Sequence, residues 1–229
     1  MKVLGIVLIL SVFLYGDNSI KLKKLQFQDI KVIHTYKGKS KELIVTREIS
    51  PVCSKYHVTP ETVHGKVYDK IEELCKRTIV TTLGKVQPFN ISGLKTIGEL
   101  EVLEHIIKSK KQPNKYVLVD VRKEEWYEIV TIPSSINIPY PNIAYDEDFP
   151  EDHEKLLKTF NITYKNGKYG FKNAKTAVLF CNGIWCGQTQ KAIKELLKIG
   201  YPKEKLQWYR GGVQQWMNLN FTTIKGNLK

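Results

Sequence analysis

TAVLFCNGIWCGQ, residues 176–188, joins a short apolar run to a loop with two cysteines and then to the start of a helix. The run 176–180 has the length and composition of a strand that is buried on both faces. The segment 187–199 is predicted to be helical and ends at Gly200, a common helix terminator. Cys181 is therefore predicted to lie at the carboxyl end of a buried strand, where open α/β sheets bind their ligands.

The alternation of strands and helices continues from residue 96 to the C-terminus. Further strands are predicted at 116–121, 136–138 and 206–209, and further helices at 151–160 and 213–219. Asn166 and Gly167, which lie between two strand-like runs, predict a two-residue hairpin. Strands that alternate with helices form parallel sheets, so we predict an α/β domain with a doubly wound parallel sheet over residues 96–229.

The first helix of this domain is predicted from a capping box. Thr96 is followed by Glu99 at the spacing in which each side chain satisfies the other residue's backbone amide. Apolar residues then recur at helical spacing. The apolar face is expected to consist of Leu100, Leu103, Ile106 and Ile107.

The N-terminus has the pattern of a signal peptide. Met1 and Lys2 precede an apolar run over residues 3–16, and a polar segment follows. The run is shorter than the roughly 20 residues that span a bilayer, which favours a signal peptide of residues 1–16, or up to residue 19. We expect export to the periplasm; an uncleaved N-terminal anchor is the alternative.

Residues 17–95 are predicted to form a small α+β appendage or a loosely ordered arm. Strands are expected at 42–49, 77–83 and 85–89, and a helix at 63–74. The segment carries no motif with recognisable chemistry, so the sequence assigns it no role.

The chain has four cysteines, and export makes disulfides an expected state for them. Cys53 and Cys75 flank the helix-like stretch of the appendage, and a disulfide between them is the simplest prediction. The rival interpretation is a metal site of Cys53, His57, His64 and Cys75. That spacing matches no compact zinc signature, so we predict no metal site.

Composition excludes several classes of protein. With 42% hydrophobic and 26% charged residues over 229 positions, the chain has the composition of a globular protein, not of a disordered or multi-span membrane protein. Its net charge of +13 would suit a binder of polyanions, but the lysines are spread along the chain and form no basic arm. We expect no nucleic-acid partner and no membrane contact beyond the N-terminus.

The loop after Cys181 has the features of a cradle for an anion or a thiolate. If residues 181–186 curl beneath the start of the helix, backbone N–H groups converge on the Cys181 sulfur, next to the positive end of the helix. Such surroundings favour the thiolate, which is the reactive form of cysteine. The alternative is a structural cysteine that only packs in the core. The amides expected to line the cradle belong to Asn182, Gly183, Ile184, Trp185, Cys186 and Gly187.

Four landmarks, in order, resemble a rhodanese domain over residues 97–222. LVDVR at 118–122 resembles the signature after the first strand of that family, and residues 131–137 fall where it usually has Gly-His-Ile-Pro-Gly-Ala and an Asn. Residues 180–188 resemble its active-site loop, and YRGGVQQW at 209–216 resembles its closing Gly-Gly turn and aromatic helix. The loop is most similar to that of exported rhodanese-like proteins with a Cys-Asn-Gly-x-Trp-Cys-Gly motif.

The resemblance implies a rhodanese-like fold and a sulfurtransferase activity. Cys181 would be the nucleophile: its thiolate attacks the outer sulfur of a donor such as thiosulfate, releases sulfite and keeps the sulfur as a persulfide. The persulfide then passes its sulfur to a thiol or to cyanide. The implied partners are a small anionic sulfur donor and a thiol acceptor, and no cofactor is implied.

Two positions depart from the family pattern. Cys186 stands where many members have an Arg or Lys that holds an anionic donor, so that cation is missing from the loop. Cys186 would either attack the persulfide, expel sulfide and close a disulfide with Cys181, or merely pack in the loop. Thr131 replaces the usual His, which is a structural residue.

Other residues near the predicted site have two interpretations each. Asp120 and Arg122 would polarise the loop or, as a charge pair, brace the turn after their strand. Arg210 would face the site as a cation or belong to its turn.

Trp185 would recognise a partner or cover the loop.

Besides the sulfurtransferase, two other functions stay open. One is a thiol-disulfide or sulfur-carrier protein that uses Cys181 and Cys186 with a protein redox partner. The other is an inactive binding module of the same fold.

Overall fold

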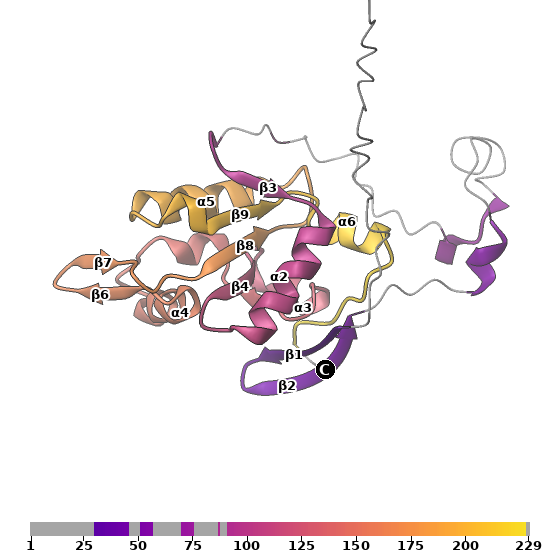
Figure 1. The fold of residues 1–229 in the computed structure, drawn as a ribbon, viewed down its shortest axis with the longest axis horizontal. Coiled ribbons are helices and arrows are strands. Elements are labelled where there is room, and N and C mark those ends of the chain that lie inside the picture. The colour runs from indigo at the N-terminus through magenta and orange to yellow at the C-terminus, as the bar shows by residue number, and fades with distance from the viewer. Residues whose placement is uncertain (1–29, 46–50, 57–69, 76–86, 88–90, 228–229) are drawn as a thin grey trace, which may run out of the picture.

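The computed structural model describes residues 30–45, 51–56, 70–75, 87 and 91–227 of the chain (Figure 1). Its centre is a five-stranded sheet in the order β3-β9-β8-β4-β5, and every pairing in this sheet is parallel. The strands are β3 (Lys95–Ile97), β9 (Leu206–Tyr209), β8 (Thr176–Phe180), β4 (Tyr116–Asp120) and β5 (Ile136–Asn137). The predicted α/β fold with a parallel sheet is confirmed.

Helices cover both faces of this sheet (Figure 1). They are α2 (Glu99–Lys111), α3 (Glu124–Ile129), α4 (Pro150–Phe160), α5 (Gln188–Lys198) and α6 (Gly212–Asn218), with 3-10 turns η4 (Tyr140–Ile143) and η5 (Lys203–Lys205). On β4, Val117 and Val119 join the apolar cluster under α4 and α5, whereas Leu118 joins the cluster under α2 and α6. Because successive strand residues point to opposite faces, β4 supplies both cores, and its residues 117–119 are all apolar.

Several predicted elements are confirmed at or close to their expected bounds. β8 and β9 begin and end where the sequence placed them. β6 (Thr163–Lys165) and β7 (Lys168–Gly170) form the predicted hairpin. Its turn residues Asn166 and Gly167 both have positive φ, 51° and 73°, as this type of two-residue turn requires.

The predicted capping box is wrong. Thr96 lies in β3, where it pairs with Trp208 of β9. The helix α2 is capped two residues later: the N–H of Gly98 donates to the carboxylate of Glu101 at 3.0 Å. Two of the expected apolar positions are exposed, and the buried residues differ from the predicted face. Leu100 and Ile107 face solvent, and the buried positions are Val102, Leu103, His105 and Ile106.

An N-terminal hairpin packs against the α/β domain. β1 (Ile30–Tyr36) and β2 (Lys39–Val45) are antiparallel, joined at Lys37 and Gly38, which have φ of 47° and 74°. The hairpin contributes Ile30, Val32 and Val45 to the cluster under α2 and α6. Residues 30–45 therefore share a core with the domain. Of the strand expected at 42–49, residues 42–45 belong to β2, which begins earlier than predicted, and residues 46–49 lie outside the described residues.

Much of the remaining appendage lies outside the described residues. This applies to the predicted signal peptide at 1–16, to most of the helix expected at 63–74 and, apart from Gln87, to the strands expected at 77–83 and 85–89. The described parts include the 3-10 turns η1 (Pro51–Lys55) and η3 (Glu73–Cys75). Among the described residues, none of the helices combines the length and apolarity needed to cross a membrane.

Burial of His34 in the hairpin makes the stability of the fold dependent on pH. Its side chain is fully buried, and its Nε2 lies 3.0 Å from the Tyr127 hydroxyl of α3. Burial lowers the pKa of His34 from 6.5 to about 4. A histidine whose pKa is lowered by folding stabilises the fold above pH 6.5 and loses that contribution as the pH falls towards 4, because the unfolded chain then binds the proton first.

We therefore expect that moving from pH 7 to pH 5 lowers the free energy of unfolding by about 2 kcal/mol through His34 alone. Urea unfolding of the wild type and of His34→Gln at both pH values measures the contribution of His34 to this pH dependence. His105, whose pKa is also lowered, is present in both proteins and cancels in the comparison. An equal pH dependence in the two proteins would contradict the assignment.

Candidate active site

The loop between β8 and α5 lies at the carboxyl edge of the parallel sheet. Cys181 follows directly on Phe180, the last residue of β8, and Gln188 begins α5. β8 is flanked by β4 and β9, so the loop emerges near the centre of the sheet. The Phe180 carbonyl accepts the N–H of Val121 at 3.1 Å, which extends the β4–β8 pairing up to the loop. Cys181 thus occupies the predicted edge.

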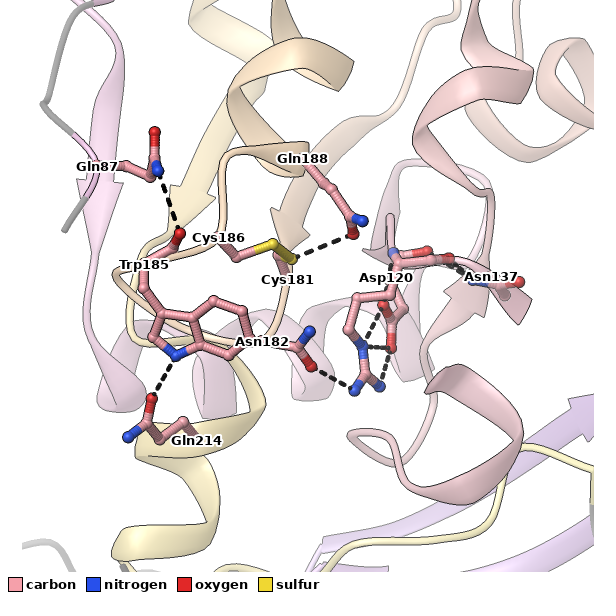
Figure 2. The surroundings of a disulfide bond; sticks show 10 residues. Gln87, Asp120, Asn137, Cys181, Asn182, Trp185, Cys186, Gln188 and Gln214 are labelled. Carbon is pink, nitrogen blue, oxygen red and sulfur yellow. Dashed lines mark hydrogen bonds and ion pairs between the residues drawn. A yellow bond between two sulfur atoms is a disulfide. The ribbon is translucent and has the colours of Figure 1, made fainter. Parts of the chain in front are cut away.

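Cys181 and Cys186 form a disulfide across this loop (Figure 2). Their Cα atoms are 6.2 Å apart. Cys181 is 2% exposed and Cys186 6%, and both join the apolar cluster on the α4 and α5 side. In this oxidised state Cys181 has no thiolate, and its sulfur is almost inaccessible. Attack of Cys181 on a sulfur donor therefore requires the reduced form.

The side chain of Gln188 faces the Cys181 sulfur (Figure 2). Its Oε1 lies 3.4 Å from Cys181 Sγ. After reduction, the thiol can donate to this oxygen, and a rotated amide presents N–H groups to a thiolate or persulfide. Sequence reasoning did not assign Gln188 a role, although its place in the first turn of the helix after the loop was a usable signal.

The turn before α6 packs directly on the loop. The carbonyls of Cys181 and Asn182 accept the N–H groups of Val213 and Gln214 at 3.0 and 2.8 Å. Gly212 has a φ of +61°, and a Cβ placed there would lie 2.3 Å from the Cys181 carbonyl oxygen. Only glycine meets both conditions, so the Gly-Gly turn allows α6 to approach the loop backbone.

One of the amides predicted to line the cradle, that of Cys186, is instead bonded within the loop. The N–H of Cys186 donates to the Gly183 carbonyl at 3.0 Å, so this amide closes a turn within the loop. Gly183 permits a close approach, since a Cβ there would lie 2.8 Å from the Oε1 of Gln214. The convergence of the other amides on Cys181 concerns the reduced site and stays a prediction.

Asp120 and Arg122 form a buried ion pair that reaches the loop. The pair is 0% and 1% exposed, and Arg122 Nη2 lies 2.6 Å from Asp120 Oδ2. Arg122 Nη1 donates to the Asn182 side-chain oxygen at 3.0 Å. Thr131 donates to Asp120 Oδ2 at 2.7 Å, and Asn137 binds the carbonyls of both Asp120 and Arg122. The pair therefore braces the end of β4 and holds Asn182.

Removing Arg122 is expected to be costly because it leaves a buried carboxylate without its cation. We expect Arg122→Met to lower the free energy of unfolding by about 3–5 kcal/mol. Urea unfolding measures the loss. Lys31→Met is the matched control, since the Lys31–Glu42 pair is exposed and should contribute less than about 1 kcal/mol. Similar losses in both variants would contradict the proposed bracing role.

Trp185 and Arg210 both contact residues around the loop. The Trp185 indole N–H donates to Gln214 Oε1 at 2.9 Å, which holds the half-buried ring against α6. Arg210 Nη2 donates to the backbone carbonyl of Gln87 at 2.7 Å, and its guanidinium lies 6.0 Å from the centre of the Trp208 ring. Sequence reasoning missed both glutamines.

Two other features lie away from this loop. Cys75 is disulfide-bonded, in agreement with the predicted Cys53–Cys75 bridge. The side chain of Cys53, like His57 and His64, lies outside the described residues, so the pairing stays a prediction.

A cavity of about 390 Å³ lies at the amino-terminal end of β4 and is lined in part by Tyr116. It is therefore at the opposite edge of the sheet from Cys181.

Comparison with known proteins identifies the family of the α/β domain. The profile of the rhodanese-like domain matches residues 101–219. Thiosulfate:glutathione sulfurtransferase of Saccharomyces cerevisiae is 31% identical over 133 residues, which cover 58% of this chain and 84% of the yeast protein. Adenylyltransferase and sulfurtransferase MOCS3 of Arabidopsis thaliana is 26% identical over 142 residues, 59% of this chain and 27% of the plant protein.

Among solved structures, a rhodanese with anions from E. coli aligns with 48% of this chain and 96% of its own, at 22% identity and a TM-score of 0.30. The domain profile spans more than half of the chain, and the yeast relative is covered over most of its length. The chain therefore belongs to the rhodanese-like family.

Proposed function

We propose that this protein is an exported sulfurtransferase that carries sulfane sulfur on Cys181. The observation that carries the proposal is the position of Cys181 directly after the central strand β8 of a rhodanese-like domain, within bonding reach of a second thiol. The similarity to a thiosulfate:glutathione sulfurtransferase supports a small anionic donor and a thiol acceptor.

The proposed cycle begins with the reduced site. The Cys181 thiolate attacks the outer sulfur of thiosulfate, the sulfur–sulfur bond of the donor breaks, and sulfite leaves with the electron pair. Cys181 then holds a persulfide. An acceptor thiolate such as that of glutathione attacks the outer persulfide sulfur, which forms an acceptor persulfide and regenerates the Cys181 thiolate.

Cys186 adds a second exit from the persulfide. Its thiolate attacks Cys181 Sγ, expels hydrosulfide and closes the Cys181–Cys186 disulfide. Two acceptor thiols then reduce this disulfide to the dithiol and are themselves oxidised to a disulfide. The oxidised loop is the expected end product of this branch, so Cys186 is proposed to be the resolving thiol.

Binding of an anionic donor is proposed to depend on amides and on Gln188. The loop has no Arg or Lys between Cys181 and Gln188, and Arg210 donates to the Gln87 carbonyl. Backbone N–H groups next to a helix start bind anions without a side-chain cation. We therefore propose that the site accepts small sulfur-containing anions as donors and that thiosulfate is one of them.

A thiol-disulfide or sulfur-carrier protein is the second candidate, favoured by the Cys181–Cys186 disulfide. In this function, a partner protein would exchange electrons or sulfur with the pair. Ile184, 43% exposed between the two cysteines, would then be part of the contact surface. The two functions share the dithiol and differ in whether thiosulfate loads Cys181.

Export is proposed from the N-terminal sequence and supported by the cysteines. The apolar run at residues 3–16 has the length of a signal-peptide core. Cys75, Cys181 and Cys186 are all disulfide-bonded, which suits an oxidising compartment such as the periplasm.

The test compares the reduced and oxidised protein as catalysts of sulfite release from thiosulfate and glutathione. The reduced protein is expected to release sulfite over many turnovers. The oxidised protein should show a lag until glutathione opens the Cys181–Cys186 disulfide. Sulfite release at the buffer rate by both forms would overturn the sulfurtransferase and leave the carrier or an inactive binding module.

A further inference from the structure

Gln87 lies outside the rhodanese-like domain, whose profile begins at residue 101, yet it binds the active-site loop. Its backbone N–H donates to the Ile184 carbonyl at 2.9 Å. Its side-chain Nε2 donates to the Trp185 carbonyl at 3.2 Å, the contact visible in Figure 2. Both carbonyls belong to the short segment between the two cysteines.

Arg210 holds Gln87 from the other side. Its Nη2 donates to the Gln87 carbonyl at 2.7 Å. The two backbone polar groups of Gln87 contact two different segments: its N–H contacts the Ile184 carbonyl, and its C=O contacts the Arg210 guanidinium. Gln87 therefore bridges the loop after β8 and the turn after β9.

The side chain of Gln87 also lies beside Gly187 of the loop. A Cβ at Gly187 would lie 3.4 Å from Gln87 Oε1, at ordinary contact distance. The glutamine amide thus packs on the backbone of Gly187 while it holds Trp185. Three hydrogen bonds and this contact connect one residue of the N-terminal appendage to both sides of the site.

We infer that Gln87 is a positioning residue for the Cys181–Cys186 pair. By holding the carbonyls of Ile184 and Trp185, it fixes the segment that carries Cys186 towards Cys181. The inference deepens the proposed function, because it concerns the resolving step of that same site. It also gives one residue of the segment 17–95 a role that the sequence did not assign.

The positioning predicts a change in the redox equilibrium of the pair. A loop held in the closed geometry favours the disulfide over the dithiol, so loss of one hydrogen bond should favour the dithiol. The expected change in the equilibrium constant is about fivefold. For a two-electron couple this corresponds to a midpoint potential about 20 mV less negative.

The experiment uses the full chain with Gln87→Ala, which removes the bond to Trp185, and Gln87→Pro, which removes the N–H to Ile184. Each protein is equilibrated in glutathione buffers, where two glutathione thiols give up two electrons as they reduce the disulfide. Alkylation and peptide mass then report Cys181 and Cys186 separately from Cys53 and Cys75. Gln112→Ala, at the exposed end of α2, is the control.

Both Gln87 variants are expected to shift the midpoint by about 20 mV or more, while the control stays at the wild-type value. Wild-type midpoints in both Gln87 variants would overturn the positioning role. Loading of Cys181 by thiosulfate is measured separately in the reduced Cys186→Ser protein, which cannot resolve a persulfide internally. Absence of loading there, together with shifted midpoints in the variants, would overturn the sulfurtransferase and retain the positioning role.

Discussion

Replacing Cys181 with serine is expected to lower the rate of sulfite release from thiosulfate by at least about 1,000-fold, to the buffer background. A serine hydroxyl is rarely ionised at neutral pH and cannot hold a persulfide. The expected loss therefore affects kcat as well as kcat/KM. Steady-state assays of the reduced full chain with thiosulfate and glutathione measure it.

Cys186→Ser is the matched control because it changes the other thiol of the same loop. It should keep sulfite release within about tenfold of the wild type, since the acceptor thiol still empties the persulfide. It should also fail to form the loop disulfide during turnover. Equal losses in the two variants would contradict the division of roles between Cys181 and Cys186.

Gly212→Ala is expected to disrupt the site through its backbone. The added methyl must tolerate a φ of +61° and would lie 2.3 Å from the Cys181 carbonyl oxygen and 2.8 Å from the Gly183 nitrogen. The left-handed backbone and the steric clash together should lower the free energy of unfolding by about 3 kcal/mol. Relief of the clash moves α6 away from the loop, so sulfite release should fall at least about tenfold.

Gly167→Ala separates the effect of a positive φ from the effect of a steric clash. Gly167 has a φ of +73°, but a Cβ there meets nothing within 4 Å. Its replacement should cost about 1 kcal/mol and leave sulfite release unchanged. Urea unfolding and sulfite assays of both variants measure the difference. If Gly212→Ala behaves like Gly167→Ala, the close approach of α6 to the loop does not support the site.

The central part of the fold could be predicted from sequence because its signals are local. The run 176–180 is apolar and buried at every position from 177 to 180, which a strand between two helical layers requires. Asn166 and Gly167 specify their turn by backbone preference alone. The same holds for Cys181, whose position follows from the end of one strand and the start of the next helix.

The features that were predicted wrongly or missed depend on tertiary contacts. Thr96 fits a capping box, but pairing with β9 takes it into the sheet, and the cap moves to Gly98. The β1–β2 hairpin turns at Lys37 and Gly38, a weaker signal than Asn-Gly. Gln87 contacts the loop from a distant part of the chain, and no local pattern reports such a contact.

The most direct test of the central claim is the mass of the reduced Cys186→Ser protein after incubation with thiosulfate. This variant cannot resolve a persulfide internally, so the account predicts one added sulfur atom, located on the peptide of Cys181 and removed by glutathione. An unchanged mass, or a sulfur atom located on Cys53 or Cys75, would contradict it.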